Sequence, residues 1–271
     1  MYPLLEKSYK GRFPFRIGSP SFIYPADYVP NVKRLGPYLD EIELLLFDST
    51  YPGALPTPKT MAELAELARD LNLTYNVHLP TDIFLGDENK AVRQQAVDTL
   101  LRVRDLTAPL NPTTLTLHLL PSPRGRYVRD LGLWQDCLRK SLGRLFAGGI
   151  DPESISVETL DYPFEWVEGI VSDLNLSICM DLGHLLVHRY DMQALFVRNQ
   201  DRVSIIHLHG VEGKRDHLAL NRMGTEDMNA AMDILCGFTG VVSIEVFSFQ
   251  DLAASLPVLE KSWRPSPSNS V

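Results

Sequence analysis

The chain has 271 residues, of which 45% are hydrophobic and 22% are charged, and its formal net charge is −8. This length allows a large buried core, and the composition is that of a globular protein, which excludes a disordered or fibrous chain. The acidic balance argues against binding to extended nucleic acid, because basic side chains on phosphates supply most of that affinity.

Export and membrane signals are not expected either. The N-terminal segment MYPLLEKSYKGRF lacks the apolar core of a signal peptide, and no run approaches the roughly 18 apolar residues of a membrane helix. The three cysteines have no CxxC spacing, which argues against a disulfide framework and against a zinc site built from thiolates alone. We therefore expect a cytoplasmic protein without membrane association.

Strand-like and helical segments alternate along the whole chain. Short apolar runs rich in β-branched residues predict eight strands, at residues 15–24, 41–48, 74–80, 113–121, 154–161, 177–186, 203–210 and 241–249. Segments of helical periodicity follow each of them, at residues 28–39, 59–72, 87–106, 127–146, 163–174, 191–199, 225–237 and 250–261.

This alternation determines the fold that we predict. No two predicted strands are adjacent in the chain, so the strands pair in parallel through helical crossovers, and eight such units close into a single (β/α)8 TIM barrel over residues 1–263. An open doubly wound sheet is the alternative, but no GxGxxG or Walker loop follows the first strand. The Pro- and Ser-rich residues 264–271 predict a disordered tail.

The stretch VSIIHLHGVEGKRDH, residues 203–217, holds three of the seven histidines. His207 and His209 are two residues apart near the end of a predicted strand, so both imidazoles leave the same face of it. Asp216 and His217 follow after a short loop. Because neutral imidazole is a common transition-metal ligand, this stretch is a candidate metal site. The alternative is a pair of hydrogen-bonded histidines without a metal.

Further ligand-type side chains lie at or just beyond the ends of other predicted strands. They are His78, His118, Glu158, Asp181 with His184, and Glu245. In a closed barrel these ends converge on one face, where active sites of this architecture are built. Several buried carboxylates are costly without a cation beside them, so we favour a metal site over a purely structural cluster. Nitrogen and carboxylate ligands suit one to three Zn²⁺, Mn²⁺ or Fe²⁺ ions, and the sequence does not choose among these metals.

In their order, with one short motif per strand, these residues resemble the xylose-isomerase-like barrel superfamily. That superfamily joins endonuclease IV-type nucleases to sugar isomerases and epimerases, and the resemblance covers about residues 15–261. The motifs that carry it are His78, His118, Glu158, Asp181-x-x-His184, His207-x-His209, His217 and Glu245.

Endonuclease IV-like members of the superfamily carry a three-zinc cluster, and the resemblance implies which residues would hold it here. His78 and His118 would match the histidine ligands on the third and fourth strands. Glu158 and Glu245 would bridge metals. The remaining ligands would be Asp181, His184, His207 and His217.

The seventh loop departs from the nuclease pattern. That pattern is Asp-x-His, whereas Arg215 stands two residues before His217, which leaves the third metal open. The segment HLHGVEGKR instead resembles the corresponding segment of the ketose 3-epimerases. In those enzymes a histidine on this strand binds a single Mn²⁺ or Co²⁺, and an arginine follows six residues later. The corresponding pair would be His209 and Arg215, so the sequence does not decide whether His207 or His209 is the metal ligand.

The epimerase resemblance implies its own set of roles. The other ligands of the single metal would be Glu158, Asp181 and Glu245. Glu158 and Glu245 would also exchange the substrate proton, and His184 would hold a substrate hydroxyl. Across the two patterns the candidate catalytic residues are therefore Glu158, Glu245, His184 and Arg215.

Within the superfamily, the phrases RDHLAL and DLGHLL resemble most the cobamide-remodelling phosphodiesterases, which cut the nucleotide loop of cobamides. The resemblance implies a metal-dependent hydrolase acting on a phosphodiester in a small nucleotide-like substrate such as a cobamide. A ketose epimerase or sugar isomerase is the alternative, and an AP endonuclease-type DNA repair nuclease is a further one. Arg124 and Arg126 follow the fourth predicted strand and are candidates for contact with a substrate phosphate. The oligomeric state stays open.

Overall fold

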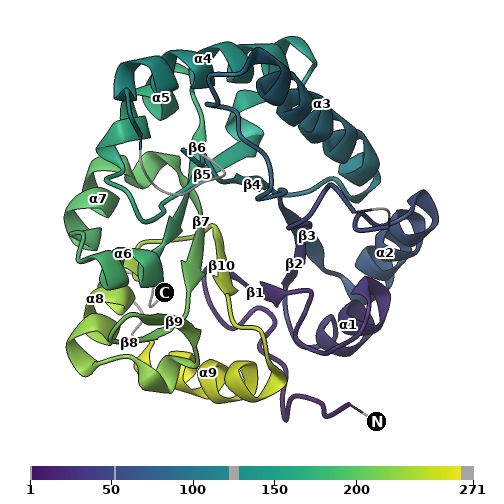
Figure 1. The fold of residues 1–271 in the computed structure, drawn as a ribbon. Helices are drawn as coiled ribbons and strands as arrows, with labels where there is room; N and C mark the ends of the chain where they lie inside the picture. The colour runs from purple at the N-terminus through teal and green to yellow at the C-terminus, as the bar shows by residue number, and fades with distance from the viewer. Residues whose placement is uncertain (1, 52, 122–127, 264–271) are drawn as a thin grey trace.

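Eight parallel strands close into a barrel in the computed structural model, which describes residues 2–51, 53–121 and 128–263 (Figure 1). Around the barrel their order is β1-β10-β7-β6-β5-β4-β3-β2. The ring closes because β1 pairs with β2 on one side, Gly18 against Glu41, and with β10 on the other, Arg16 against Val241. The prediction of a (β/α)8 barrel is confirmed. The barrel strands are β1 (Arg16–Pro20), β2 (Glu41–Leu45), β3 (Thr74–His78), β4 (Leu115–Leu117), β5 (Ile155–Glu158), β6 (Ser177–Asp181), β7 (Val203–Leu208) and β10 (Val241–Ile244).

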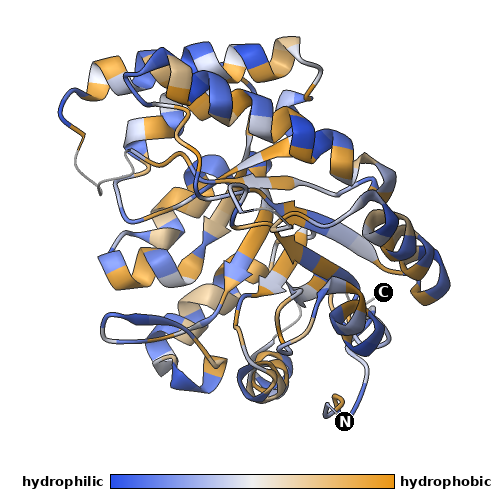
Figure 2. Ribbon diagram, turned by 45° about the vertical axis from the view of Figure 1, so that its right-hand side comes forward, coloured by the Kyte–Doolittle hydropathy of each residue, from blue (hydrophilic) through white to orange (hydrophobic). Residues whose placement is uncertain are grey.

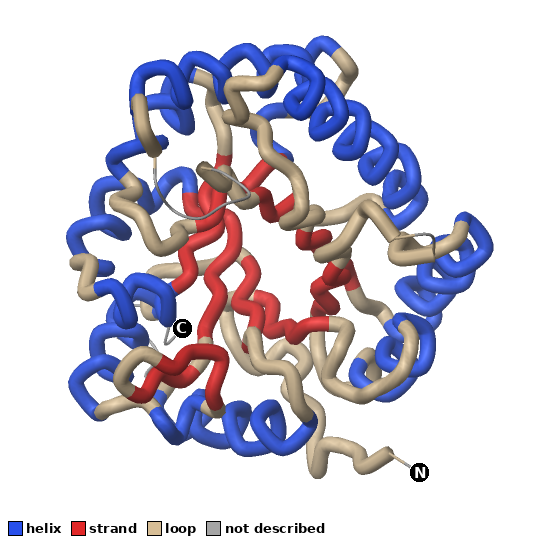
Figure 3. The backbone as a smooth tube through the Cα atoms, viewed as in Figure 1, coloured by secondary structure: helices blue, strands red, loops and turns tan. Residues whose placement is uncertain are grey.

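Helices form a ring outside the strands (Figure 3). Apolar and polar residues alternate along them (Figure 2), and on the second helix Met61 and Leu64 are buried whereas Lys59 and Glu66 are exposed. Thr57 caps that helix by accepting a hydrogen bond from the Thr60 backbone N–H. The α-helices are α1 (Tyr28–Leu35), α2 (Pro58–Leu71), α3 (Lys90–Thr107), α4 (Leu131–Ala147), α5 (Glu165–Asp173), α6 (Leu182–His188), α7 (Met192–Asn199), α8 (Thr225–Leu235) and α9 (Phe249–Ser262), and the 3₁₀ turns are η1 (Ala108–Leu110), η2 (Pro152–Ser154), η3 (Gln200–Arg202) and η4 (Leu220–Arg222).

Several element boundaries differ from the sequence-based prediction, and most strands are shorter than predicted. The sixth strand ends at Asp181 and not at residue 186, because the Asp181 carboxylate accepts a 2.7 Å hydrogen bond from the His184 backbone N–H and so begins α6. Helix α1 ends at Leu35, before Gly36 and Pro37, since Pro37 has no backbone N–H with which to continue the helical hydrogen bonds. The first strand is also shorter than predicted, at Arg16–Pro20.

The predicted loop after β7 is an antiparallel hairpin. Its strands are β8 (Gly210–Glu212) and β9 (Arg215–Leu218), and Gly213 turns between them with φ of 66°. The hairpin packs beside α6 (Figure 1). The hairpin therefore brings His217 close to His209, which directly follows β7.

The barrel interior becomes polar toward the carboxyl ends of the strands. Cys179, Ile205 and Val241 form a small apolar cluster on the face that also carries Asp181 and His207. The main hydrophobic core is a separate cluster that involves both strands and helices. Beyond this small cluster, the side chains toward the carboxyl ends of the same strands are ionisable, as Asp181 and His207 are.

Three sequence-based predictions fall on residues that are not described. Arg124 and Arg126 belong to residues 122–127, and the predicted tail covers residues 264–271. In the described part of the chain, no helix is long and apolar enough to cross a membrane.

Candidate metal centre

The carboxyl ends of six barrel strands and the hairpin bring nine ligand-type residues together. His78, Glu158 and Asp181 are the last residues of their strands, and Glu245 follows β10 directly. These residues form four overlapping groups, and the potential ligand atoms inside each group lie within 4.8 Å of one another. The nine residues are His78, His118, Glu158, Asp181, His184, His207, His209, His217 and Glu245, and one of the groups also includes Cys179, beside Glu158 and His207.

The first group joins two histidines to one carboxylate oxygen. Nε2 of His118 lies 2.9 Å from Oε2 of Glu158, and Nε2 of His78 lies 3.3 Å from the same oxygen. The Nδ1 atom of His78 lies 3.0 Å from the carbonyl oxygen of Leu79. A hydrogen bond from Nδ1–H to that carbonyl leaves the Nε2 lone pair directed at the Glu158 side, as metal-ligating histidines require.

The second group lies deeper and surrounds one nitrogen with three carboxylates. Nδ1 of His207 is 3.0 Å from Oε2 of Glu245, 3.8 Å from Oε2 of Glu158 and 3.9 Å from Oδ2 of Asp181. All four side chains are at most 4% exposed. His207 Nδ1 and Glu245 Oε2 have no hydrogen-bond partner of acceptable geometry among the described residues. Buried, unsatisfied atoms of this kind fit a divalent cation, which would neutralise the carboxylates and bind the nitrogen.

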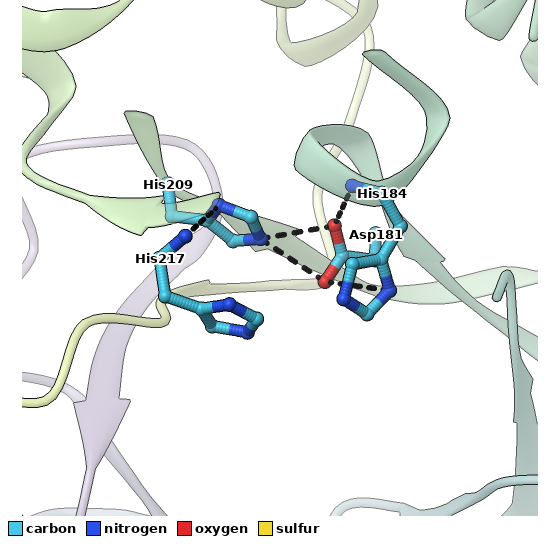
Figure 4. A group of neighbouring side chains, drawn as sticks. All are labelled: Asp181, His184, His209 and His217. Atoms are coloured by element: carbon cyan, nitrogen blue, oxygen red, sulfur yellow. Dashed lines mark hydrogen bonds and ion pairs between the residues drawn. The ribbon is translucent and has the colours of Figure 1, made fainter. Parts of the chain in front are cut away.

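The third group is shown in Figure 4 and consists of Asp181, His184, His209 and His217. His209 Nε2 lies 3.1 and 3.2 Å from the two Asp181 oxygens, and His184 Nδ1 lies 3.4 Å from Oδ2. The His217 ring stacks on that of His209 with centroids 4.2 Å apart. His184 and His217 also approach the other groups, at 3.5 Å from Glu158 and 3.5 Å from Glu245 respectively.

His209 has both ring nitrogens engaged. Its Nδ1 accepts a 2.9 Å hydrogen bond from the His217 backbone N–H, so in the neutral ring the proton is on Nε2, which donates to Asp181. The close approach of the ring requires Gly183, since a Cβ atom there would lie 1.9 Å from Cε1 of His209. His209 therefore has the geometry of a residue that orients Asp181, whereas His207 directs a nitrogen at three carboxylates.

The charges of the cluster support one another. Burial alone would raise the pKa of Glu158, but His118 and His207 hold it well below its usual range. The pKa of Glu245 is likewise held low, against burial, by His207 and His217. Burial would lower the pKa of His217, but the hydrogen bond and charge of Glu245 outweigh burial and raise it to about 9. Protons therefore occupy the centre in the absence of a cation, and metal binding would release them.

A pocket of about 440 Å³ leads from the surface to this centre. Phe47 and Phe247 border it with 37% and 43% of their surface exposed, and their ring centroids are 6.4 Å apart. Among the histidines, His118, His184 and His217 are 16–23% exposed at the pocket, whereas His207 is fully buried. The lining residues are Phe47, His78, Thr81, His118, Leu120, Glu158, His184, His217, Glu245 and Phe247.

The structure places Arg215 apart from these residues. It lies exposed on β9, and no ion pair joins it to a carboxylate in the described part of the chain. Sequence analysis missed two buried side chains beside His207, namely Glu43 on β2 and Cys179 on β6. The spacing in EIELLLFD contains a signal for the first, because Glu41 and Glu43 share one face of a strand predicted to be buried on both faces.

Residues 29–264 match the model of the xylose isomerase-like TIM barrel family, and the chain belongs to this family. No curated protein matches the chain in sequence. One similar solved structure is that of a D-tagatose 3-epimerase-like protein, with 20% identity and a TM-score of 0.75, covering 92% of this chain and 97% of that one.

Two further structures illustrate the range of activities on this fold. Endonuclease IV from Thermus thermophilus has 19% identity and a TM-score of 0.67, covering 91% of this chain and 98% of its own. D-Psicose 3-epimerase from Clostridium cellulolyticum, solved with D-tagatose, has 14% identity and a TM-score of 0.67, covering 95% and 93%. Sugar epimerases and a nuclease thus have folds similar to this one, and at these identities the likeness concerns the fold alone.

Proposed function

We propose that the chain is a metal-dependent phosphodiesterase acting on a small nucleotide-like molecule, with the nucleotide loop of a cobamide as the leading substrate. The observation that carries this proposal is the pair of histidines, His78 and His118, whose Nε2 atoms both meet Oε2 of Glu158. These two histidines lie beside the group around His207 and share only Glu158 with it. Glu158 would therefore be a ligand of two adjacent cations. A single-metal epimerase has no need of these two histidines as ligands.

The proposed metal ligands follow from the three groups described above. His78, His118 and Glu158 would hold one Zn²⁺, Mn²⁺ or Fe²⁺ ion, and the second would be held by Glu158, Asp181, His207 and Glu245. His184 and His217 would bind a third ion with Asp181, which His209 orients. Bound metals of this kind supply an acidified water as nucleophile and positive charge for the attacking and leaving oxygens of a phosphodiester.

The protein's own side chains would position the substrate. The partly exposed edges of His118, His184 and His217 border the pocket, so the scissile group would enter between them. Phe47 and Phe247 would cover the apolar part of the substrate and exclude water from the reacting group. Arg124 and Arg126 would meet the charge of the substrate phosphate.

The choice of substrate rests on the volume of the pocket, the net charge of the chain and the two short sequence segments DLGHLL and RDHLAL. About 440 Å³ accommodates a small molecule or one nucleotide unit, and the net charge of −8 disfavours a long nucleic acid. The phrase DLGHLL spans the end of β6 and the start of α6, and RDHLAL begins at β9. Asp181, His184 and His217, which these two segments contain, belong to the candidate metal centre.

A ketose epimerase is the second candidate. Its specific support is the arrangement of Glu158 and Glu245, which both approach His207 Nδ1 and would abstract and return a carbon-bound proton on a single metal. His184 would then hold a substrate hydroxyl. An AP endonuclease-type nuclease is a further alternative, to which the same metal cluster is suited.

The proposal is tested by incubating protein loaded separately with Zn²⁺, Mn²⁺ and Fe²⁺ with a cobamide, a panel of ketoses and an abasic DNA duplex, and following the products by mass spectrometry. We expect cleavage of the cobamide at its phosphodiester and no change in the ketoses. Turnover of a ketose with both phosphodiesters left uncut would replace the proposal with the epimerase, and cleavage of the duplex alone would replace it with the nuclease.

A further inference from the structure

We propose that Glu43, a buried glutamate of β2, is a positioning residue that fixes which nitrogen of His207 faces the metal centre. The inference rests on the proposed function, because it concerns how His207 would bind a cation. It adds to the centre a side chain from a strand that contributes no ligand.

The contacts of Glu43 extend across the barrel interior. Its Oε1 atom lies 3.0 Å from Nε2 of His207 on β7, and its Oε2 atom accepts a 2.6 Å hydrogen bond from the Ser243 hydroxyl on β10. Strands β2 and β7 are not neighbours in the sheet, since β1 and β10 lie between them. Glu43, His207 and Ser243 are all 0% exposed, so water does not compete for these contacts.

His207 has a carboxylate oxygen 3.0 Å from each ring nitrogen, Glu43 Oε1 at Nε2 and Glu245 Oε2 at Nδ1. When a cation bound by Glu245 occupies the Nδ1 side, the proton of a neutral His207 must lie on Nε2, where Glu43 faces it. A carboxylate has only acceptor oxygens, so the contact at 3.0 Å is favourable only when Nε2 carries the proton. The lone pair is then on Nδ1, which faces Glu158, Asp181 and Glu245. The other tautomer would direct an N–H at the cation position and set the Nε2 lone pair 3.0 Å from the buried Glu43 oxygen, so that two acceptors face each other, which is costly. Carboxylate partners of this kind raise the basicity of a ligating histidine and hold its orientation.

Glu41 provides an internal comparison. It lies two residues earlier on the same strand face and is equally buried, at 0% exposure. Its Oε1 atom accepts hydrogen bonds from Asn76 at 2.9 Å and Thr113 at 2.7 Å, so its requirement is met by structural donors. Glu43 Oε1, in contrast, faces His207 Nε2 at 3.0 Å, and neither atom has a hydrogen bond of acceptable geometry within the described residues. Glu41 is therefore expected to contribute to stability, whereas Glu43 is expected to act on the metal centre through His207.

The test compares Glu43→Gln with the control Glu41→Gln in the full chain. Zn²⁺ affinity is measured by chelator competition, the Co²⁺-loaded proteins are compared by visible absorption, and thermal unfolding of the metal-free proteins reports the fold. We expect Glu43→Gln to weaken Zn²⁺ binding by roughly 10- to 100-fold and to change the Co²⁺ spectrum. Glu41→Gln should lower the unfolding temperature and leave Zn²⁺ affinity and the Co²⁺ spectrum as in the wild type.

Imidazole ¹⁵N spectra of the Zn²⁺-loaded wild type give a second measurement that needs no variant to fold. We expect the His207 signal of a ring protonated at Nε2, and a ring protonated at Nδ1 would overturn the inference. Wild-type Zn²⁺ affinity in Glu43→Gln would also overturn it while leaving the proposed function intact. Loss of affinity in a protein that cleaves no phosphodiester would support the inference and refute the proposed function, and a wild type that binds no metal would refute both.

Discussion

Replacing His118 by alanine separates the two leading functions. In the structure His118 Nε2 lies 2.9 Å from Glu158 Oε2, and the side chain is 16% exposed at the pocket, so water can fill the space that the ring leaves. Because loss of a residue that only supports a ligand already costs about 10- to 100-fold in metal affinity, loss of this ligand should cost at least about 1.4–2.7 kcal/mol of metal binding. The fold should be little affected.

The assay measures metal content per chain and the rates of cobamide cleavage and ketose epimerisation. We expect His118→Ala to lose at least one metal equivalent and to slow phosphodiester cleavage by at least about 100-fold, since the charge on the reacting oxygens is no longer neutralised. His188→Ala is the control, because His188 ends α6 outside all four groups of ligand atoms. A His118→Ala protein with full metal content and wild-type hydrolysis would refute this reasoning, and intact epimerisation alone would favour the single-metal function.

Three further predictions concern the same centre. Glu245→Gln should reduce metal content and activity together, because it removes a charged ligand; elemental analysis that finds full metal in an inactive variant would contradict this. Gly183→Ala should displace His209, whose ring a Cβ atom would meet at 1.9 Å, and so weaken metal binding in a chelator competition; an unchanged affinity would show that His209 does not act on the centre. The metal-free protein should lose stability as pH rises from about 6.5 to 9. The pKa of His217 is about 9 in the folded state and about 6.5 in the unfolded state, so its contribution to the free energy of unfolding is complete below pH 6.5 and is lost as the pH rises to about 9. Urea unfolding that shows a constant free energy over this pH range would contradict the prediction.

The sequence by itself determined the barrel and placed most of the nine residues at the carboxyl ends of its strands, although His184 lies on α6 and His217 on the hairpin. Eight alternating units require parallel pairing, and a period of two residues assigns His207 and His209, or Glu41 and Glu43, to one face of a strand. A residue such as His118 is therefore placed at the carboxyl end of the barrel without knowledge of its neighbours. The end of β6 was harder to predict, because the apolar run after Asp181 suits a strand as well as a helix.

Only the tertiary structure decided which of these side chains meet. Period-two alternation says nothing about partners across the barrel, so it cannot show that Glu43 on β2 reaches His207 on β7. The choice between His207 and His209 depends on the hairpin, which brings the His217 backbone N–H to Nδ1 of His209 and so commits that ring to Asp181. The first contact crosses the barrel between strands that are not neighbours in the sheet, and the second needs the hairpin turn together with the pairing of β6 and β7.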